Sequence, residues 1–584
     1  MASSSLFLLL VGFYLFNSIN ALPTSSSSIW KHIFSPERFA KHRDRGNNNK
    51  LGAVASENAI CSKIGTSVLL NGGNAADSLV ATVLCVGTTA MYHSGIGGGG
   101  FMLVRAPNGT YEFIDFRETA PAAAYEDMYK NNTDASIFGG LASGVPGELR
   151  GLEYLHKNYG RLPWAKLVWP SVLLARNGFP VNEDLVKYMK SGVADAGRDF
   201  LTEDPTWALD FAPNGTLLGL GDTITRRRYA DTLEKIARRG ADAFYEGAIA
   251  QATINALQAA NGTMTMDDLK DYTIAKRELS QITYRGFKIT STSAPSSGGV
   301  LMNILKTVDG YEDFFAEGSV NLSTHRLDEA MRFAYAQRTN LGDPLFVDGL
   351  DEYQKTMVSD ATAKAIRGKI SDNRTQNVSA YNPDGLESLE TPGTSHISTA
   401  DHTGLAISLT TTINLLFGST LMIPETGIIM NNEMNDFSIP GLSNAFGFIP
   451  SPSNYVRPGK RPLSSITPTI ITHPNGSLYF ITGAAGGSRI ITSTLQSIIG
   501  VLDRGMTGPQ ALAQPRFHDQ LVPDRVTFEF AFENSTVAFM RERGHDVTWV
   551  AEGQSTVQAI RVLANGTFEA AGEPRQKNSA GIAV

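Results

Sequence analysis

The chain has 584 residues, of which 42% are hydrophobic and 18% charged, with a formal net charge of −7. This composition excludes a disordered chain, a coiled coil and a collagen-like repeat. Mild acidity, without any cluster of Lys and Arg, argues against nucleic acid as a partner. The length is enough for one large hydrophobic core or two ordinary ones.

The N-terminus opens with an apolar run, residues 6–16 (LFLLLVGFYLF), and no charged side chain precedes Lys31. A membrane-spanning helix needs about 20 apolar residues, so this run is short for that purpose. Because the small residue Ala21 follows at a suitable distance, we expect a signal peptide over residues 1–21. An uncleaved anchor is the alternative, since the run lacks a basic flank. Residues 22–50 are polar and predict a flexible lead-in.

Ten Asn-x-Ser/Thr sequons agree with export, although five of them are Asn-Gly sequences that also favour turns. They begin at Asn108, Asn131, Asn214, Asn261, Asn321, Asn373, Asn377, Asn475, Asn534 and Asn565. We expect a glycoprotein of the secretory pathway, either extracellular, on the cell surface or vacuolar.

The two cysteines lie in neighbouring helical patterns. Residues 60–70 and 74–85 both have apolar side chains at helical spacing, and Gly72-Gly73 separates them. Two helices joined by so short a turn pack antiparallel, which brings Cys61 beside Cys85. A disulfide fits this geometry and an oxidising compartment, with two buried free thiols as the alternative.

Further along the chain, helix and strand signals alternate. Residues 101–115 predict a hairpin around Asn108-Gly109, residues 164–177 and 226–257 predict helices, and residues 371–393 predict an exposed loop. A region rich in strands follows, with a helix after it. The predicted strands are residues 395–399, 405–413, 427–430, 466–471 and 478–482, and the helix is residues 488–502. This mixture indicates an α+β fold of sheets covered by helices.

Several motifs of known chemistry are absent. The sequence has no G-x-S-x-G, no H-E-x-x-H and no G-x-x-x-x-G-K-[ST], and its ten histidines show no pair at metal-ligand spacing. Residues 95–100 (GIGGGG) precede a strand rather than a helix, so they do not form a dinucleotide loop. We expect a tight backbone crossing there, and neither a metal nor an organic cofactor.

Residues 393–398 (GTSHIS) contain a candidate nucleophile. Thr394 follows a glycine at the end of the predicted exposed loop and begins a buried strand. Its hydroxyl is placed to attack the preceding carbonyl, and hydrolysis of the resulting ester would leave a free α-amine. That amine, with an unperturbed pKa of about 8, would then serve as general base for the same hydroxyl. Taken alone the pattern is weak, because Gly-Thr before a strand is common.

The neighbouring residues strengthen this hypothesis. The turn at residues 401–404 folds the strand after Thr394 back on the next one, which puts Thr412 opposite Thr394 and Asn414 on the same face. The other candidate groups lie downstream, and each also has an ordinary structural interpretation. They are the carboxylates Glu433 and Asp436 for a substrate ammonium, the loop residues Ser464 and Ser465, and Gly486 and Gly487 at a strand-to-helix junction suited to an oxyanion.

Together these segments resemble the γ-glutamyltranspeptidases, in family order from about Leu51 to near the C-terminus. The matching stretches are CSKIGTSVLLNGGNAADSLVATVLCVG, SGIGGGGF, FRETAP, GVPGELRGL, GTSHIS, TTINLLFGS, GIIMNNEMNDFS, PSPSNYVRPGKRPLSS and TGAAGGSRI. The resemblance implies an N-terminal-nucleophile hydrolase with a four-layer αββα sandwich. It also implies self-cleavage between Gly393 and Thr394 into a heterodimer, with a large subunit over residues 51–393 and a small one over 394–584.

The resemblance further implies roles for individual residues. Thr394 would be the nucleophile, and Thr412 would support it. Arg117, Ser464 and Ser465 would bind the α-carboxylate of the γ-glutamyl group. Its α-amino group would be bound by Asn414, Glu433 and Asp436. Gly486 and Gly487 would stabilise the oxyanion of the reaction.

The implied activity is that of a γ-glutamyltransferase and glutathione hydrolase. The γ-glutamyl group of glutathione or a conjugate would pass to water or to an amino acid or dipeptide acceptor. Two positions depart from the family: Asn435 replaces a frequent Asp, which lowers the local charge, and Leu416 replaces the Tyr of animal-type members, which bears on acceptor preference and on the ratio of transfer to hydrolysis. The alternatives are an acylase of the same superfamily, acting on glutaryl or β-lactam side-chain amides, and an unprocessed, inactive binding glycoprotein.

Overall fold

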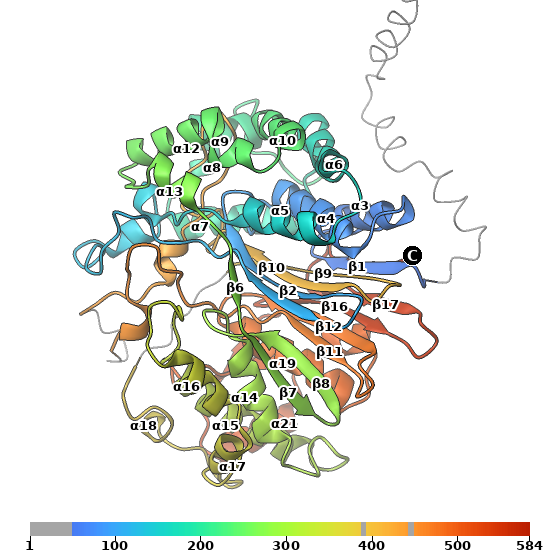
Figure 1. Ribbon diagram of the computed structural model, residues 1–584. Coiled ribbons are helices and arrows are strands. Elements are labelled where there is room, and N and C mark those ends of the chain that lie inside the picture. The colour runs from blue at the N-terminus through green and yellow to red at the C-terminus, as the bar shows by residue number, and fades with distance from the viewer. Residues whose placement is uncertain (1–48, 387–392, 442–448) are drawn as a thin grey trace, which may run out of the picture. The chain divides into compact units, whose positions relative to one another are not determined.

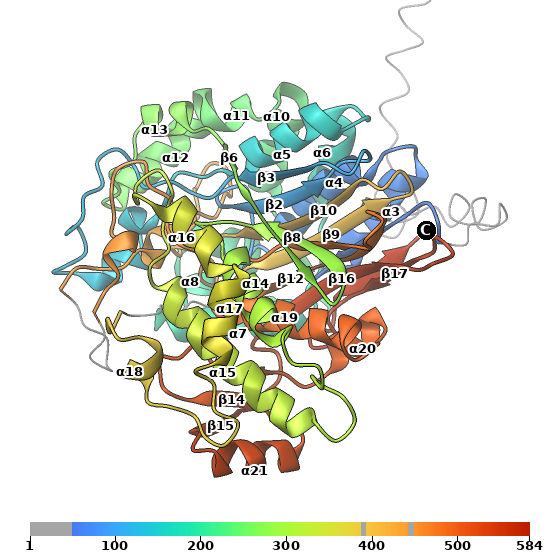
Figure 2. The ribbon, with the colours of Figure 1, turned by 60° about the horizontal axis from the view of Figure 1, so that its bottom comes forward.

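The computed structural model describes residues 49–386, 393–441 and 449–584. Two β-sheets lie face to face, and a layer of helices covers the outer face of each (Figures 1 and 2). This arrangement confirms the predicted α+β fold and its four αββα layers. The predicted signal peptide and nearly all of the lead-in lie outside the described residues.

The first sheet has seven strands, and each neighbouring pair is antiparallel. Their order is β18 (Ala580–Ala583), β1 (Gly52–Ser56), β9 (Ser395–Asp401), β10 (Ala406–Thr412), β2 (Gly99–Arg105), β3 (Tyr111–Asp115) and β6 (Ala275–Arg277). The strand that follows Thr394 is β9, and it is flanked on both sides. Strands buried on both faces keep a fixed register, so the position of Thr394 is well determined.

The second sheet has six strands, also paired antiparallel. Their order is β17 (Phe568–Ala571), β16 (Thr556–Val562), β12 (Leu478–Ala485), β11 (Thr469–Thr472), β8 (Phe287–Thr292) and β7 (Leu279–Tyr284). Small side chains from the first sheet, among them Ala53, Ala55, Ala400 and Ala406, pack against Ile470, Ile481 and Ile560 of the second. Because these alanines are short, the central strands of the two sheets lie close together.

Helices cover both outer faces (Figure 1). On the first sheet lie α3 (Ala59–Leu70), α4 (Ala75–Thr89) and α5 (Glu148–Tyr159), with α6 (Trp164–Asn177) packed on α4. On the second lie α14 (Gly298–Val308), α19 (Arg489–Leu502) and α20 (Gly508–Ala513), with α15 (Val320–Arg338) packed on α14. Within the described ranges, no helix combines the length and apolar character that crossing a bilayer requires.

The remaining elements are shorter or lie further from the sheets. The helices are α7 (Glu183–Ala196), α8 (Phe200–Glu203), α9 (Pro205–Phe211), α10 (Arg227–Arg239), α11 (Asp242–Tyr245), α12 (Gly247–Ala259), α13 (Met266–Asp271), α16 (Leu350–Met357), α17 (Asp360–Arg367), α18 (Val378–Tyr381) and α21 (Asn534–Glu542). The strands are β4 (Phe179–Pro180), β5 (Thr223–Ile224), β13 (Phe517–His518), β14 (Val526–Glu529) and β15 (Val547–Val550).

Most of the predicted elements are confirmed. The hairpin of residues 101–115 is the β2–β3 pair, and the helices predicted at residues 164–177 and 488–502 are α6 and α19. The helix predicted over residues 226–257 is instead three helices, α10, α11 and α12. Gly240 (φ 80°) and Gly247 (φ 72°) interrupt it, because a positive φ cannot continue a right-handed helix.

Three expectations were wrong in part. Residues 427–430 form only an isolated bridge, Met422 with Ile429, and no strand. The strand predicted at residues 466–471 begins at Thr469, because Pro468 cannot donate to a ladder. The loop predicted at residues 371–393 contains the short helix α18. Its Tyr381 is buried, and the hydroxyl donates to Glu329. Residues 387–392 lie outside the described residues.

The predicted disulfide between Cys61 and Cys85 is present, and it joins α3 to α4 with a Cα–Cα distance of 5.3 Å. Replacing both cysteines by Ser should lower the free energy of unfolding by about 3 kcal/mol, because the unfolded chain regains the freedom of a loop of 24 residues. Urea unfolding without reductant measures the difference. In reductant the two proteins should become nearly equal, and an equal stability in both conditions would contradict the prediction.

Candidate active site

Thr394 and Thr412 lie opposite one another at the end of the β9–β10 hairpin. The register pairs Ser395 with Thr411, so the next position on each strand is Thr394 and Thr412. The Thr394 hydroxyl donates to the Thr412 hydroxyl at 3.4 Å, and both residues are buried. The Thr412 hydroxyl also accepts from the Asn414 N–H at 2.7 Å, which fixes its orientation.

The peptide linkage between Gly393 and Thr394 has unusual geometry. Gly393 has a φ of 121° and Thr394 a φ of 106°, a region that a β-branched residue occupies only under strain. A Cβ at Gly393 would lie 1.7 Å from the carbonyl oxygen of Asn414, so only glycine fits before Thr394. The backbone is therefore strained at the bond that the sequence analysis predicts to be cleaved.

Gly486 and Gly487 lie between the end of β12 and the start of α19. The N–H of Gly486 donates to the carbonyl oxygen of Gly393 at 3.2 Å. Both glycines have positive φ, 124° and 60°, and a Cβ at Gly486 would lie 2.7 Å from the carbonyl oxygen of Gln554. A backbone donor from the second sheet thus contacts the carbonyl next to the Thr394 hydroxyl, where an oxyanion would form.

Arg117, Glu433 and Asp436 meet in a buried ion-pair cluster. Arg117 follows β3 and donates one Nη to each carboxylate, while Glu433 and Asp436 belong to a short 3-10 helix, Glu433–Asp436. Burial raises the pKa of Asp436, and Arg117 opposes this rise, as does a hydrogen bond from Asn414. The predicted carboxylate-binding and ammonium-binding groups are therefore together, and here they form ion pairs with each other.

Ser464 and Ser465 are held by a residue that sequence reasoning missed. The buried Arg338 of α15 donates its Nη2 to the Ser465 hydroxyl at 3.1 Å and its Nε to the Ser297 hydroxyl at 3.2 Å. Ser297 in turn donates to the carbonyl of Ser464 at 2.5 Å. Nothing in the spacing of the sequence connects Arg338 to this loop, because 126 positions separate it from Ser464.

Glu118 was also missed, although it stands next to Arg117 in the FRETAP motif. It is fully buried, and a Cβ at Gly99, the partner of Thr412 across the strands, would lie 2.8 Å from its Oε2. Among the described residues, no side chain donates a hydrogen bond to its carboxylate. Burial raises the pKa of Glu118 to about 8, and the nearby Arg117 offsets only part of this effect. Glu118 is thus mainly protonated at neutral pH.

The glycine run before β2 is a tight crossing, as predicted. A Cβ at Gly98 would lie 2.0 Å from the carbonyl oxygen of Thr412, and one at Gly97 would lie 2.1 Å from that of Ile429. The run lets the backbone pass directly against the strand that positions Thr412.

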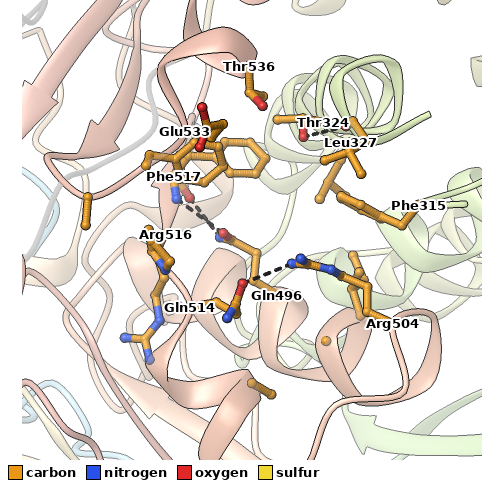
Figure 3. A pocket seen from close by; sticks show the side chains of 17 residues that line it. Phe315, Thr324, Leu327, Gln496, Arg504, Gln514, Arg516, Phe517, Glu533 and Thr536 are labelled. Carbon is orange, nitrogen blue, oxygen red and sulfur yellow. Dashed lines mark hydrogen bonds between the residues drawn. The ribbon is translucent and has the colours of Figure 1, made fainter. Parts of the chain in front are cut away.

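A pocket of about 260 Å³ lies elsewhere, among α15, α19, α20 and α21 (Figure 3). Phe315, Leu327, Phe517 and Phe532 give it apolar walls, and Arg504 and Glu533 are among its polar lining residues. It contains none of the predicted site residues, so it is separate from the Thr394 site.

The fold and the threonine at the start of a central strand define the class of N-terminal-nucleophile hydrolases. The family model "Gamma-glutamyltranspeptidase" matches residues 61–583, and the chain belongs to that family. It is 59% identical, over the whole of both chains, to the "Glutathione hydrolase proenzyme" of Arthroderma benhamiae. It is 54% identical to the "Glutathione hydrolase" of Aspergillus flavus, over 91% of this chain and 89% of that protein.

Two solved structures support the same assignment. The cephalosporin acylase of Bacillus halodurans superposes with a TM-score of 0.80 at 25% identity, covering 92% of this chain and 96% of that one. The γ-glutamyltranspeptidase of Helicobacter pylori superposes with a TM-score of 0.52 at 32% identity, covering 55% of this chain and 92% of that one.

The raised pKa of Glu118 predicts a pH effect on stability. The folded protein keeps a proton on this carboxyl up to about pH 8, whereas the unfolded chain keeps it only up to about pH 4.5. The protonated carboxyl therefore contributes fully to the free energy of unfolding below pH 4.5, and this contribution is lost as the pH rises to 8. Glu118→Gln should therefore lose less thermal stability than the wild type between pH 5 and 8.5. The exposed Glu317→Gln is the matched control, and identical losses in all three proteins would contradict the prediction.

Proposed function

We propose that this protein is a γ-glutamyltransferase and glutathione hydrolase that matures by cleaving its own chain between Gly393 and Thr394. The observation that supports this best is the arrangement at that bond. A hydroxyl, a strained linkage and a backbone donor on the carbonyl oxygen converge there. Whole-chain similarity to a protein named glutathione hydrolase proenzyme supports the same function.

In the maturation step, the Thr394 hydroxyl attacks the carbonyl carbon of Gly393. The N–H of Gly486 stabilises the negative charge that develops on the oxygen, and Thr412 orients the hydroxyl. The C–N bond breaks and the nitrogen takes a proton, which leaves an ester on the Thr394 oxygen. Water hydrolyses that ester, giving a carboxylate on Gly393 and a free α-amine and hydroxyl on Thr394.

In turnover, the free α-amine accepts the proton of the Thr394 hydroxyl as this attacks the γ-amide of a donor such as glutathione. The amine part of the donor leaves with a proton, and the γ-glutamyl group remains as an ester on Thr394. Attack of water on this ester releases glutamate, which is hydrolysis. Attack of the amine of an amino acid or dipeptide moves the γ-glutamyl group to that acceptor, which is transfer. The backbone of Gly486 and Gly487 stabilises the oxyanion in both steps.

Substrate selection follows from the buried cluster of Arg117, Glu433 and Asp436. An incoming γ-glutamyl group brings an α-carboxylate for Arg117 and an α-ammonium for the two carboxylates, so each buried charge keeps an opposite partner. Because the α-centre is held there, only an amide at the γ position reaches Thr394. A glutaryl group lacks the ammonium and would leave the carboxylates less well paired, which argues against an acylase despite the structural similarity.

We further propose that the mature protein is a heterodimer of the two chain parts in the secretory pathway, and is extracellular, on the cell surface or vacuolar. The disulfide between α3 and α4 supports an oxidising compartment. The apolar run at residues 6–16 and the sequons support export, since the Asn of nine of the ten sequons is exposed.

Thr394→Ala should yield a single intact chain without turnover, because both cleavage and catalysis need the hydroxyl. Thr394→Ser keeps a hydroxyl and should still be cleaved, more slowly than the wild type. Denaturing mass spectrometry after deglycosylation measures this, and wild-type material should contain a chain that begins at Thr394. A cleaved, active Thr394→Ala protein would refute the proposed mechanism.

Asp436→Asn should weaken selection for the α-amino group. Loss of one charged hydrogen bond costs about 1.5–3 kcal/mol, so kcat/KM for a γ-glutamyl anilide should fall about 10- to 100-fold. The value for a glutaryl anilide, which has no amine, should change much less. The exposed Asp351→Asn serves as control, and an equal loss with both anilides would show that Asp436 does not read the amine.

A further inference from the structure

Two histidines and two acids from segments far apart in the sequence meet inside the helical layer on the second sheet. His325, Asp328 and Glu329 belong to α15, and His545 follows α21. All four are buried, and His325, Asp328 and Glu329 have no exposed surface. One ligand atom each from His325, Glu329 and His545 lies within 4.8 Å of the others.

The hydrogen-bond partner of His325 determines where its proton lies. The Nε2 of His325 is 2.8 Å from the carbonyl oxygen of Ser371, which only accepts, so this nitrogen has the hydrogen. The Nδ1 of His545 is 3.1 Å from an oxygen of Asp328, but this ion-pair contact lacks the geometry of a hydrogen bond. The N–H of His325 therefore points outward, and its Nδ1 has a lone pair.

The remaining two nitrogens face each other. His325 Nδ1 and His545 Nε2 are 2.8 Å apart, so the lone pair of His325 is directed at the second imidazole. Either a hydrogen on His545 Nε2 or a metal ion bound by both nitrogens satisfies this lone pair.

The surroundings favour a metal. Glu329 adds a carboxylate to the two imidazole nitrogens, and two His with one carboxylate are a common ligand set for zinc. Each ligand also has an outer partner: the Ser371 carbonyl for His325, Asp328 for His545, and the Tyr381 hydroxyl, which donates to Glu329 at 2.8 Å. Outer partners of this kind orient metal ligands in zinc proteins.

We propose that His325, Glu329 and His545 bind a divalent transition-metal ion of the zinc class, in a structural role separate from the Thr394 site. Zinc–nitrogen bonds of about 2.05 Å at a tetrahedral angle would place the two nitrogens about 3.3 Å apart. The imidazoles would thus move apart by roughly half an ångström, and one coordination position would remain for water.

The site would also connect the two parts of the chain. His325 and Glu329 precede Gly393, His545 follows it, and Ser371 and Tyr381 belong to the segment that leads to that bond. The disulfide lies wholly before the bond, so it does not link the two parts. This consequence rests on the proposed self-cleavage, whereas metal binding itself does not.

The test uses the full wild-type protein, stripped with a chelator, dialysed and incubated with zinc sulfate alone. We expect about one zinc per molecule by elemental mass spectrometry and a rise in Tm of at least about 2 °C. His325→Ala and His545→Ala should each lose the bound zinc. His473→Ala, a half-buried histidine that packs on Phe287 and Tyr479, should retain it.

Wild-type protein that binds no zinc and shows no change in Tm would overturn the proposal, whether or not the variants fold. The contact between the two imidazoles would then be a hydrogen bond. Thr394→Ala separates this result from the proposed function. The uncleaved chain should bind zinc as the wild type does, so a failure of self-cleavage leaves the metal measurement unaffected.

Discussion

The structure depends on the close approach of two sheets at one strained peptide linkage. β9 and β10 of the first sheet place the hydroxyls of Thr394 and Thr412 together, and the end of β12 in the second sheet brings the N–H of Gly486 to the Gly393 carbonyl. The approach is possible because alanines line the facing surface of the first sheet and because Gly393 and Gly486 lack a Cβ. Larger side chains at these points would separate the Thr394 hydroxyl and the Gly393 carbonyl from the N–H of Gly486.

Buried charge imposes the second constraint. Arg117, Glu433 and Asp436 are removed from water, and a buried charge is tolerated only beside an opposite one. Arg117 pairs with both carboxylates, and in the proposed function a zwitterionic α-centre would replace these contacts so that each charge keeps an opposite partner. Glu118, beside them, meets the same constraint by keeping its proton, as its pKa of about 8 indicates. In the proposed function, selection for a γ-glutamyl group would therefore be a consequence of low polarity around the site.

The order of strands explains how two chains could stay associated after cleavage. In the first sheet β18, β9 and β10 follow the Gly393–Thr394 bond in sequence, while β1, β2, β3 and β6 precede it. The two sets alternate, so backbone hydrogen bonds cross between them at three places in that sheet. The second sheet adds the β11–β8 pair. Separation would expose these ladders and the apolar layer between the sheets, at a large cost in free energy.

The sequence by itself determined the elements with local signals. These include the β2–β3 hairpin around Asn108-Gly109, the α3–α4 pair with its disulfide, and the strand after Thr394 with Thr412 opposite, because turn residues and spacing act between near neighbours. It also indicated the carboxylate pair Glu433 and Asp436, and it named Arg117 through the resemblance to a family. Only the tertiary structure decided that these three pair with one another, that Arg338 holds the serine loop, that Glu118 lies against Gly99, and that His325 faces His545. Such contacts join residues far apart in the chain. The protonation of the side chains involved depends on their burial, which no local sequence pattern indicates.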